Sequence, residues 1–391
     1  MITRFLINAI HLKNSSCRIN GTGNVPDDDI DSACASHIGP TEKHEVFNTG
    51  KAFFAYSTPV ILLLGLVGNS LSLMVFTSKN LRKLSASSYL AALSVADLST
   101  LLFYVLIEWL RRGLTYISPQ TKLVFLDKDG CCQFLLYMSY ISRLMSSWII
   151  VVFTIERFTG VCYPLKTFRR GAKRFLLSIL LTSCILSVYK PILSGEYTSR
   201  GITACSANPN HEFISFVLDS VYAILITLIP FIVITTLNIL IVRKLFLRNR
   251  LNRDIFSEDT RIRLEFTIIL LAISFFFVAF NLPFSVVWAR NILHSYKRHS
   301  TSEFTPNLPD YWTGVLNITR PIFYMNYCIN FILYNITGKS FRKALVEKIA
   351  CESKSRNKND SYIKCRQMVS CNTTNTTFSE RSIHSIRSDN V

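Results

Sequence analysis

The sequence predicts an all-α membrane protein: a seven-transmembrane helix bundle with a short cytoplasmic amphipathic helix after the last span. Of its 391 residues, 49% are hydrophobic, and the mean hydropathy is +0.30. The apolar residues form blocks of about 20 residues, long enough to cross a bilayer as helices. No block alternates with period two, which argues against a transmembrane barrel. The blocks are 53–77, 86–108, 133–160, 174–193, 213–242, 264–289 and 311–334.

The basic residues predict the orientation of these spans. The formal net charge is +18, and Lys and Arg are concentrated in alternate connections, at 78–85, 161–174 and 243–263, and again after the last block. The positive-inside rule makes that side cytoplasmic. We therefore expect a multi-pass plasma-membrane protein with an extracellular N-terminus. The positive charge is explained by membrane orientation, and we expect no nucleic-acid partner.

The two ends of the chain differ from the membrane domain at 53–350. Residues 1–52 are expected to be an extracellular segment, glycosylated at Asn14 and Asn20, although such triplets also arise by chance in polar sequence. Residues 351–391 are rich in Ser, Thr, Asn and Arg without apolar periodicity, which predicts a disordered cytoplasmic tail. An odd number of cysteines is expected outside, where disulfides persist, so one thiol stays free or pairs elsewhere. They are Cys17, Cys34, Cys131, Cys132 and Cys205.

The third block carries the most information. Cys132 and Arg157 are 25 residues apart, or roughly 37 Å along a helix, so they lie at opposite membrane surfaces. Ser139, Arg143 and Ser146 fall on or near the face that joins them. An Arg in the middle of the lipid costs at least ~2.5–3.5 kcal/mol, so this face points into the bundle.

Several motifs of the chain resemble those of the rhodopsin-like (family A) G-protein-coupled receptors. The sequence "ERF" at 156–158 with "VCYPL" at 161–165 is similar to the signature that ends the third span in that family. Further similarities follow in the family's order through 53–350. They are "GN" at 68–69, "LSVAD" at 93–97, Pro230, "FVAFNLPF" at 277–284 and "NFILY" at 330–334.

This resemblance implies several roles. It implies a disulfide between Cys132 and Cys205. It implies coupling to a heterotrimeric G protein through Glu156, Arg157 and Tyr334, with arrestin and receptor kinases acting on the tail. On the residues alone, Arg157 could simply extend to the membrane interface. The chain departs from the family where Arg263 replaces a frequent acidic partner of that arginine, and where Asn238 and Asn281 replace the expected Tyr and Trp.

Asp97 lies in the middle of the second block, where a carboxylate needs polar partners. The resemblance implies a sodium or water pocket here. Oxygen ligands suit a hard cation such as sodium. The alternative is a hydrogen-bonded network that holds helices together without any ion. No other cofactor is expected. The candidate members besides Asp97 are Asn69, Ser146, Asn281, Asn326 and Asn330.

The segment after Tyr334 turns basic. Phe341, Leu345 and Ile349 recur every four residues, which predicts an amphipathic helix lying on the lipids of the inner leaflet. Cys351 at its end is a candidate palmitoylation site. The alternative is a solvated basic tail.

The outer halves of the spans are expected to line a ligand pocket. The third span has Ser139 where amine receptors of this family carry Asp, and the last block has no Lys for retinal. We expect Glu108 to bind a cationic group of a peptide, unless it pairs with Arg111 or Arg112. The candidate ligand-binding residues are Glu108, Ser139, Tyr140, Arg143, Phe284, Trp288, Arg320 and Tyr324.

The resulting prediction is a neuropeptide receptor, most similar to invertebrate receptors of the FMRFamide and myosuppressin type. Asn281-Leu-Pro and the pair Asn330-Phe331 carry that similarity. Arg143 and Arg320 also suit an anionic lipid or a nucleotide, which is the alternative. A seven-span transporter is a distant alternative, because transporters tend to contain internal repeats and we find none in this sequence. The sequence contains no HExxH motif, and we do not expect an enzyme.

Overall fold

The computed structural model describes residues 40–79, 81–82, 84–121, 123–162, 171–199, 202–251, 258–301 and 311–355. Asn14 and Asn20 lie outside these ranges, as do most of the expected N-terminal segment and nearly all of the expected tail. The side chain of Cys351 is also outside the described part, so the predicted modifications remain predictions.

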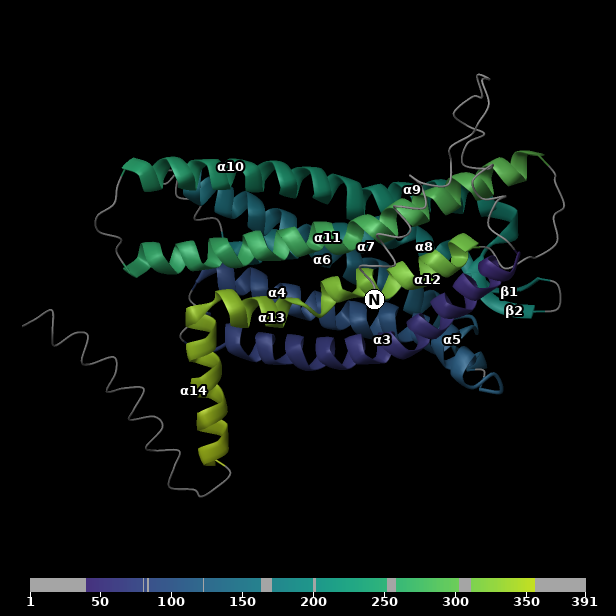
Figure 1. Ribbon diagram of the computed structural model, residues 1–391, viewed down its shortest axis with the longest axis horizontal. Coiled ribbons are helices and arrows are strands. Elements are labelled where there is room, and N and C mark those ends of the chain that lie inside the picture. Colours follow the sequence, from purple (N-terminus) through teal and green to yellow (C-terminus); the bar gives the residue numbers. More distant parts are fainter. Residues whose placement is uncertain are drawn as a thin grey trace, which may run out of the picture.

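Long helices lie side by side and form one elongated bundle (Figure 1). Within the described residues, six helical stretches are long and apolar enough to cross a membrane, and they match the first six predicted blocks. Two of the stretches contain π segments, η1 (Leu101–Val105) and η4 (Ile224–Leu228). The helices are α3 (Pro40–Phe76), α4 (Ser85–Thr100), α5 (Leu106–Ile117), α6 (Cys131–Cys162), α7 (Ala172–Ser187), α8 (Tyr189–Ile192), α9 (Glu212–Ala223), α10 (Ile229–Leu251) and α11 (Glu258–Thr301).

The seventh predicted span is helical but interrupted. It consists of α12 (Tyr311–Tyr324), the 3₁₀ segment η5 (Met325–Tyr327) and α13 (Asn330–Thr337), and it is not among the six long stretches. The break frees backbone carbonyls that lipid could not satisfy. Asn69 on α3 donates its side-chain NH₂ to the carbonyl of Tyr327 at 2.7 Å. Asn326 donates in the same way to the carbonyl of Phe323 at 3.0 Å, so part of the cost of the break is met locally.

One close contact sets the path of the seventh span. A Cβ atom on Gly50 of α3 would collide with the carbonyl oxygen of Gly314 on α12. In the other direction, a Cβ on Gly314 would lie 2.7 Å from the carbonyl oxygen of Val46. Small residues at such crossings let two membrane helices approach backbone to backbone.

The opposite ends of the bundle carry different structures. At one end an antiparallel hairpin of β1 (Ser194–Ser199) and β2 (Ile202–Ala207) lies beside the short segments η2 (Val124–Leu126) and η3 (Pro209–His211). At the other end α14 (Lys339–Ser355) leaves the bundle and runs across its axis (Figure 1). We refer to the hairpin end as the outer end and to the α14 end as the inner end.

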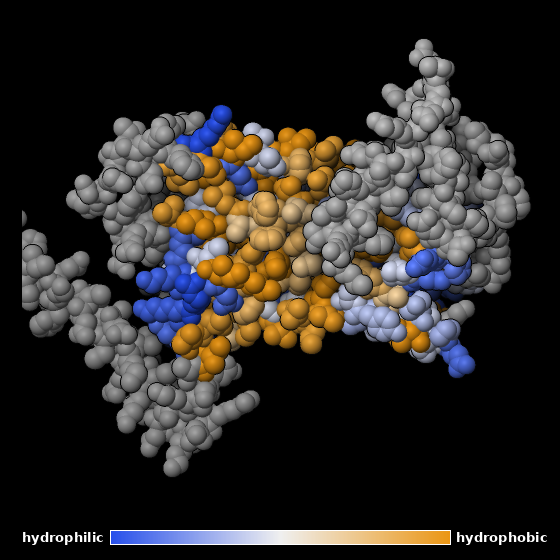
Figure 2. Space-filling model, in the orientation of Figure 1, coloured by the Kyte–Doolittle hydropathy of each residue, from blue (hydrophilic) through white to orange (hydrophobic). Residues whose placement is uncertain are grey.

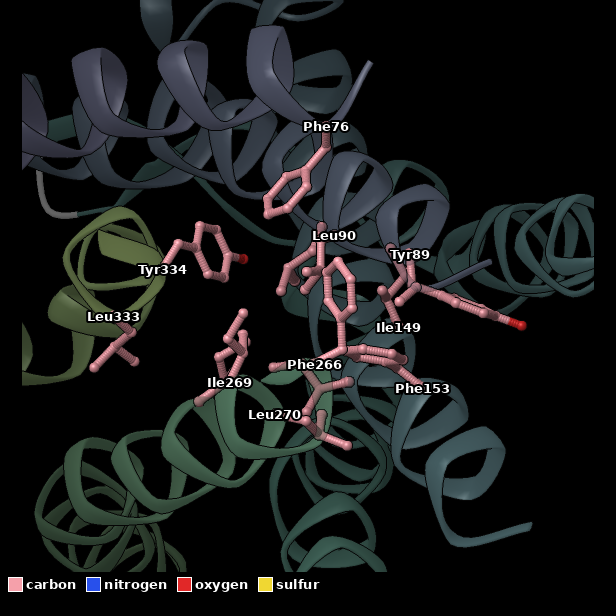
Figure 3. Close-up of a cluster of buried hydrophobic side chains, with 14 of the residues drawn as sticks. Phe76, Tyr89, Leu90, Ile149, Phe153, Phe266, Ile269, Leu270, Leu333 and Tyr334 are labelled. Atoms are coloured by element: carbon pink, nitrogen blue, oxygen red, sulfur yellow. The ribbon is translucent and has the colours of Figure 1, made fainter. Parts of the chain in front are cut away.

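Two apolar clusters fill the bundle, and apolar side chains also cover its outside. The larger cluster occupies the inner half, where Phe76, Tyr89, Phe153 and Tyr334 converge from four helices (Figure 3). A smaller cluster in the outer half contains Tyr324. Hydrophobic residues form a broad band around the middle of the molecule (Figure 2). Their exposure matches a surface that faces lipid.

The amphipathic helix differs from the prediction in the face that it uses. Phe341 is only 2% exposed, because its ring packs against Phe76 and Tyr334 at centroid distances of 5.2 and 5.4 Å. Val346 and Ile349 are exposed instead. The expected apolar face is therefore divided: Phe341 anchors α14 to the bundle, and Ile349 is exposed.

Candidate functional site

A disulfide holds the outer hairpin against the third span. Cys132 at the start of α6 and Cys205 on β2 are joined, with their Cα atoms 5.7 Å apart. The carboxylate of Asp129 accepts a hydrogen bond from the backbone N–H of Glu196 on β1 at 2.8 Å. These two attachments place the hairpin beside the outer end of α6 and confirm the disulfide that the resemblance implied.

Glu108 is paired with two arginines. Its Oε2 atom lies 2.8 Å from Nε of Arg112, one turn along α5, and 3.4 Å from Nη1 of Arg320 on α12. The alternative pairing with Arg112 is therefore what the structure contains, and Arg320 joins it from the seventh span. A carboxylate that already has two cationic partners is a poor acceptor for a ligand guanidinium, against our expectation from the sequence.

Arg143 lies in the bundle interior among aromatic rings. Its guanidinium carbon is 4.2 Å from the ring centroid of Tyr104, 4.6 Å from that of Tyr140 and 5.4 Å from that of Tyr222. These rings come from η1, α6 and α9, so three spans meet around one cation. We call these four residues the tyrosine box.

A partly buried ion pair supports one wall of the tyrosine box. Asp219 on α9 accepts hydrogen bonds from the hydroxyl groups of Tyr140 and Tyr189, each at 2.9 Å, and from Nζ of Lys190 at 2.7 Å. Our reading of the sequence missed both members of this pair. Asp219 lies inside a predicted span and Lys190 near the end of another, and an ionisable residue at such a position is itself a signal of function.

The remaining candidate ligand residues lie nearby with modest polar contacts. Phe284 on α11 stacks on Phe323 at 4.9 Å, and Tyr324 meets Tyr104 edge to face at 5.5 Å. Ser139 is buried and accepts the Nε–H of Arg143 on its backbone oxygen at 3.1 Å. Trp288 is half-buried one turn beyond Phe284.

A cavity of about 460 Å³ opens at the outer ends of α3, α5 and α12. Its lining includes the basic residues Lys51, Arg111 and Arg112 together with aromatic rings such as Phe54. Asp127 pairs with Arg111 at 3.4 Å and Glu108 pairs with Arg112 at 2.8 Å, which leaves the charge of Lys51 as the excess. The outer opening therefore has an excess of positive charge, which attracts anions.

Asp97 is fully buried and accepts one hydrogen bond on each carboxylate oxygen. The hydroxyl of Ser146 on α6 donates to Oδ1 at 2.6 Å, and the side-chain NH₂ of Asn330 on α13 donates to Oδ2 at 2.7 Å. Three helices thus meet at one carboxylate. Asn281 is not a direct partner, because its NH₂ group donates to the carbonyl of Phe277 on its own helix at 2.7 Å.

Asn69 and Asn326 likewise contribute to this region without bonding to Asp97, because they satisfy the carbonyls at the break of the seventh span. The carboxylate of Asp97, the hydroxyl of Ser146 and the buried, unbonded Oδ1 of Asn69 are hard oxygen donors. Such donors fit a sodium ion. A His, Cys, Asp and Glu cluster of the kind that binds a transition metal is absent from the described residues.

The predicted coupling residues lie at the inner end. Arg157 approaches Oε1 of Glu156 with its Nη2 atom at 3.3 Å, and the hydroxyl of Ser85 donates to the same oxygen at 2.6 Å. The guanidinium also lies 5.3 Å from the ring centroid of Phe153. Tyr334 is fully buried in the inner cluster. The side chain of Arg263 is outside the described part.

A polar contact links the sixth span to α14. Glu265 on α11 accepts the backbone N–H of Ser340 at 2.6 Å and its hydroxyl at 2.9 Å. Ser340 lies in the first turn of α14, where N–H groups have no partner within the helix. The carboxylate therefore caps α14 and holds the inner end of α11 against it.

The comparisons with known proteins agree with this architecture. Residues 68–334 match the family model for the 7 transmembrane receptor (rhodopsin family). Neurotensin receptor type 1 of Rattus norvegicus is 25% identical over 85% of this chain and 82% of its own length. Purinoceptor 1 of Gallus gallus is 27% identical over 78% and 82%, respectively. Thyrotropin-releasing hormone receptor of Gallus gallus is 24% identical over 88% of both chains. The chain therefore belongs to the rhodopsin family of G-protein-coupled receptors, which are multi-pass proteins of the plasma membrane.

Proposed function

We propose that this receptor binds an extracellular peptide at its outer end and activates a heterotrimeric G protein at its inner end, with its N-terminus outside the cell. The observation that carries the proposal is the composition of the outer interior. Paired charges of both signs, Glu108 with Arg320 and Asp219 with Lys190, stand among aromatic walls. A peptide offers side chains of each of these kinds at once, whereas a small amine does not.

The relatives support a peptide ligand without excluding a second candidate. Two of the three named above are receptors for neurotensin and for thyrotropin-releasing hormone, which are peptides. Within the peptide receptors, we propose the FMRFamide and myosuppressin type, on Asn281-Leu-Pro and on Asn330-Phe331.

The second candidate ligand is a nucleotide or an anionic lipid. The purinoceptor among the relatives favours a nucleotide. So does Arg143, because no carboxylate of the described chain contacts it. The experiment below therefore includes both classes.

Activation follows from a shift between two arrangements of the bundle. A ligand that binds one arrangement more tightly shifts a pre-existing equilibrium toward it. We propose that the inner end of α11 moves outward about Pro283, a proline inside this helix, which separates Glu265 from Ser340. The movement would expose Arg157 to the G protein. The hydroxyl of Tyr334 is buried without a hydrogen bond, so a rearrangement that satisfies it lowers the cost of the active state.

We also propose roles for partners around this core. Sodium at Asp97 would supply a positive charge that favours the arrangement in which Ser146 and Asn330 surround the carboxylate. The exposed apolar residues of α14 would contact lipids of the inner leaflet, with a palmitoyl chain on Cys351. Arrestin and receptor kinases would act on the tail beyond Ser355.

The test expresses the receptor in cultured cells with dissociation sensors for each G-protein subtype. Libraries of amidated and free-acid peptides, then nucleotides and lysophospholipids, are applied in turn. We expect a peptide response that Arg157→Ala abolishes at unchanged surface expression. Arg174→Ala removes an exposed arginine of α7 at the same end of the bundle and should leave the response within twofold.

Two other outcomes would change the proposal. A response to nucleotides or lipids alone would replace the peptide proposal by the second candidate. A peptide response that survives Arg157→Ala would show that coupling does not depend on this arginine.

A further inference from the structure

The tyrosine box surrounds Arg143 with aromatic faces, and the hydroxyl groups of two of its rings are used elsewhere. The hydroxyl of Tyr140 donates to Asp219 at 2.9 Å, and that of Tyr222 donates to the backbone oxygen of Tyr140 at 2.8 Å. These bonds fix both rings with their π faces toward the guanidinium. The box therefore stabilises a positive charge through cation–π contacts, and these hydroxyl groups do not accept from the cation.

The guanidinium keeps unused hydrogen-bond donors. An arginine presents five N–H groups, and the Nε–H of Arg143 donates to the carbonyl of Ser139 at 3.1 Å. None of its described contacts is with a carboxylate. The two terminal amino groups are not sealed off as unpaired buried atoms. The side chain of Arg143 is partly exposed, although it lies inside the bundle. The Arg143 side chain therefore keeps some accessible surface inside the bundle.

The carboxylates near the tyrosine box do not neutralise the charge of Arg143. In the described outer half of the interior, Glu108 is held by Arg112 and Arg320, and Asp219 by Lys190. Both carboxylates thus have basic partners already. A cation in a low-dielectric site without a counter-ion is costly, and an anion from elsewhere would offset that cost.

We propose that the tyrosine box is the anchor for an oxyanion of the ligand, a carboxylate or a phosphate, held by the terminal amino groups of Arg143. The planar fork of the guanidinium matches two oxygens of such a group, and the basic outer cavity attracts it from solution. This inference rests on the proposed ligand entry at the outer end. It favours the alternative that the sequence left open, an anionic group at Arg143, over a cationic group of the ligand at Glu108.

The test measures binding to purified receptor in detergent, so it needs no G protein. Four probes are titrated at millimolar concentrations and followed by the thermal unfolding midpoint. N-acetyl-Phe-Leu is used as the free acid and as the C-terminal amide, and adenosine 5′-diphosphate is compared with adenosine. We expect the anionic member of at least one pair to bind about tenfold or more tightly than its neutral partner. The pair that discriminates identifies a carboxylate or a phosphate as the source.

The variants assign that preference to Arg143. In Arg143→Gln the anionic probe should bind about 10- to 100-fold more weakly, the size expected for lost charged hydrogen bonds, while the neutral probe is unaffected. Arg143→Lys keeps the charge without the fork and should retain part of the preference, which also covers the case in which the glutamine variant does not fold. Lys128→Gln removes a positive charge from an exposed outer position and should change nothing beyond twofold.

Three results would overturn the anchor: equal binding of anionic and neutral probes, equal weakening of both by Arg143→Gln, or no binding of any probe to the wild-type receptor. The proposed function fails in a different way. Oxyanion-selective binding without any G-protein response would contradict the coupling and leave the anchor intact. A peptide response that Arg143→Gln leaves unchanged would contradict the anchor and leave the coupling intact.

Discussion

Asp97 and Arg143 are two charges of opposite sign inside the bundle, on neighbouring helices, and their surroundings differ in kind. Asp97 is enclosed by donors, with one hydrogen bond on each oxygen. Arg143 is enclosed by ring faces, with most of its donors unused. Ser146, which binds Asp97, follows Arg143 by about one helical turn on α6. The two charges nevertheless have separate neutral partners, so each remains able to take an external ion of the opposite sign.

The largest expected effect comes from removing the acceptor at Asp97. Asp97→Leu leaves the hydroxyl of Ser146 and the NH₂ group of Asn330 without their acceptor, and we expect the free energy of unfolding to fall by about 1–3 kcal/mol. Asp97→Asn keeps an acceptor and should lose less than half of that. Thermal unfolding in detergent measures both. Equal losses in the two variants would mean that the charge, rather than the hydrogen bonds, stabilises the site.

The tyrosine box should respond to the loss of a ring rather than of a hydroxyl. Tyr104→Leu removes the nearest aromatic face from Arg143, and we expect a loss of about 0.5–2 kcal/mol in the free energy of unfolding. Tyr104→Phe keeps the face and should stay within a few tenths of a kcal/mol of wild type. A phenylalanine variant as unstable as the leucine variant would contradict the cation–π account.

Sodium should distinguish the two charges directly. Replacing choline chloride by sodium chloride at constant ionic strength should raise the unfolding midpoint of the wild type. Sodium at ten times the Kd of one site stabilises the folded state by about 1.4 kcal/mol. The shift should vanish in Asp97→Asn and persist in Arg143→Gln. If sodium and choline give the same midpoint in the wild type, the hydrogen-bonded network operates without the ion.

Glu265 at the inner end is a partly exposed charge. Of the charges compared, we expect its removal to have the smallest effect on stability. Glu265→Gln weakens the bonds to Ser340 by about 1 kcal/mol or less, which raises the active fraction by up to about fivefold. G-protein sensors without ligand would record higher basal signalling. Ser340→Ala removes one of the same bonds and should act in the same direction. Unchanged basal signalling in both would show that this contact does not restrain α11.

Much of the fold could be predicted because membrane spans are set by local composition. The first six blocks agree with long helical stretches, and the third span carries its disulfide and Arg157 at opposite ends as its length requires. Ser146 and Asn330 were among the candidate partners of Asp97, because a buried carboxylate in lipid must find donors, but the sequence did not separate them from Asn69, Asn281 and Asn326. The break in the seventh span was not predictable, since the carbonyl of Tyr327 is satisfied by Asn69, which is far away in the sequence.

The sequence by itself therefore determined the number and extent of the spans, the family and the presence of buried charges, because apolar length and motif spacing are properties of the chain. Only the tertiary structure decided which charges meet. Glu108 is taken by Arg320 from the last span, and Arg143 is left to tyrosines from three spans. Those pairings depend on how each helix is rotated and tilted in the bundle, which packing against neighbouring helices sets and local sequence does not.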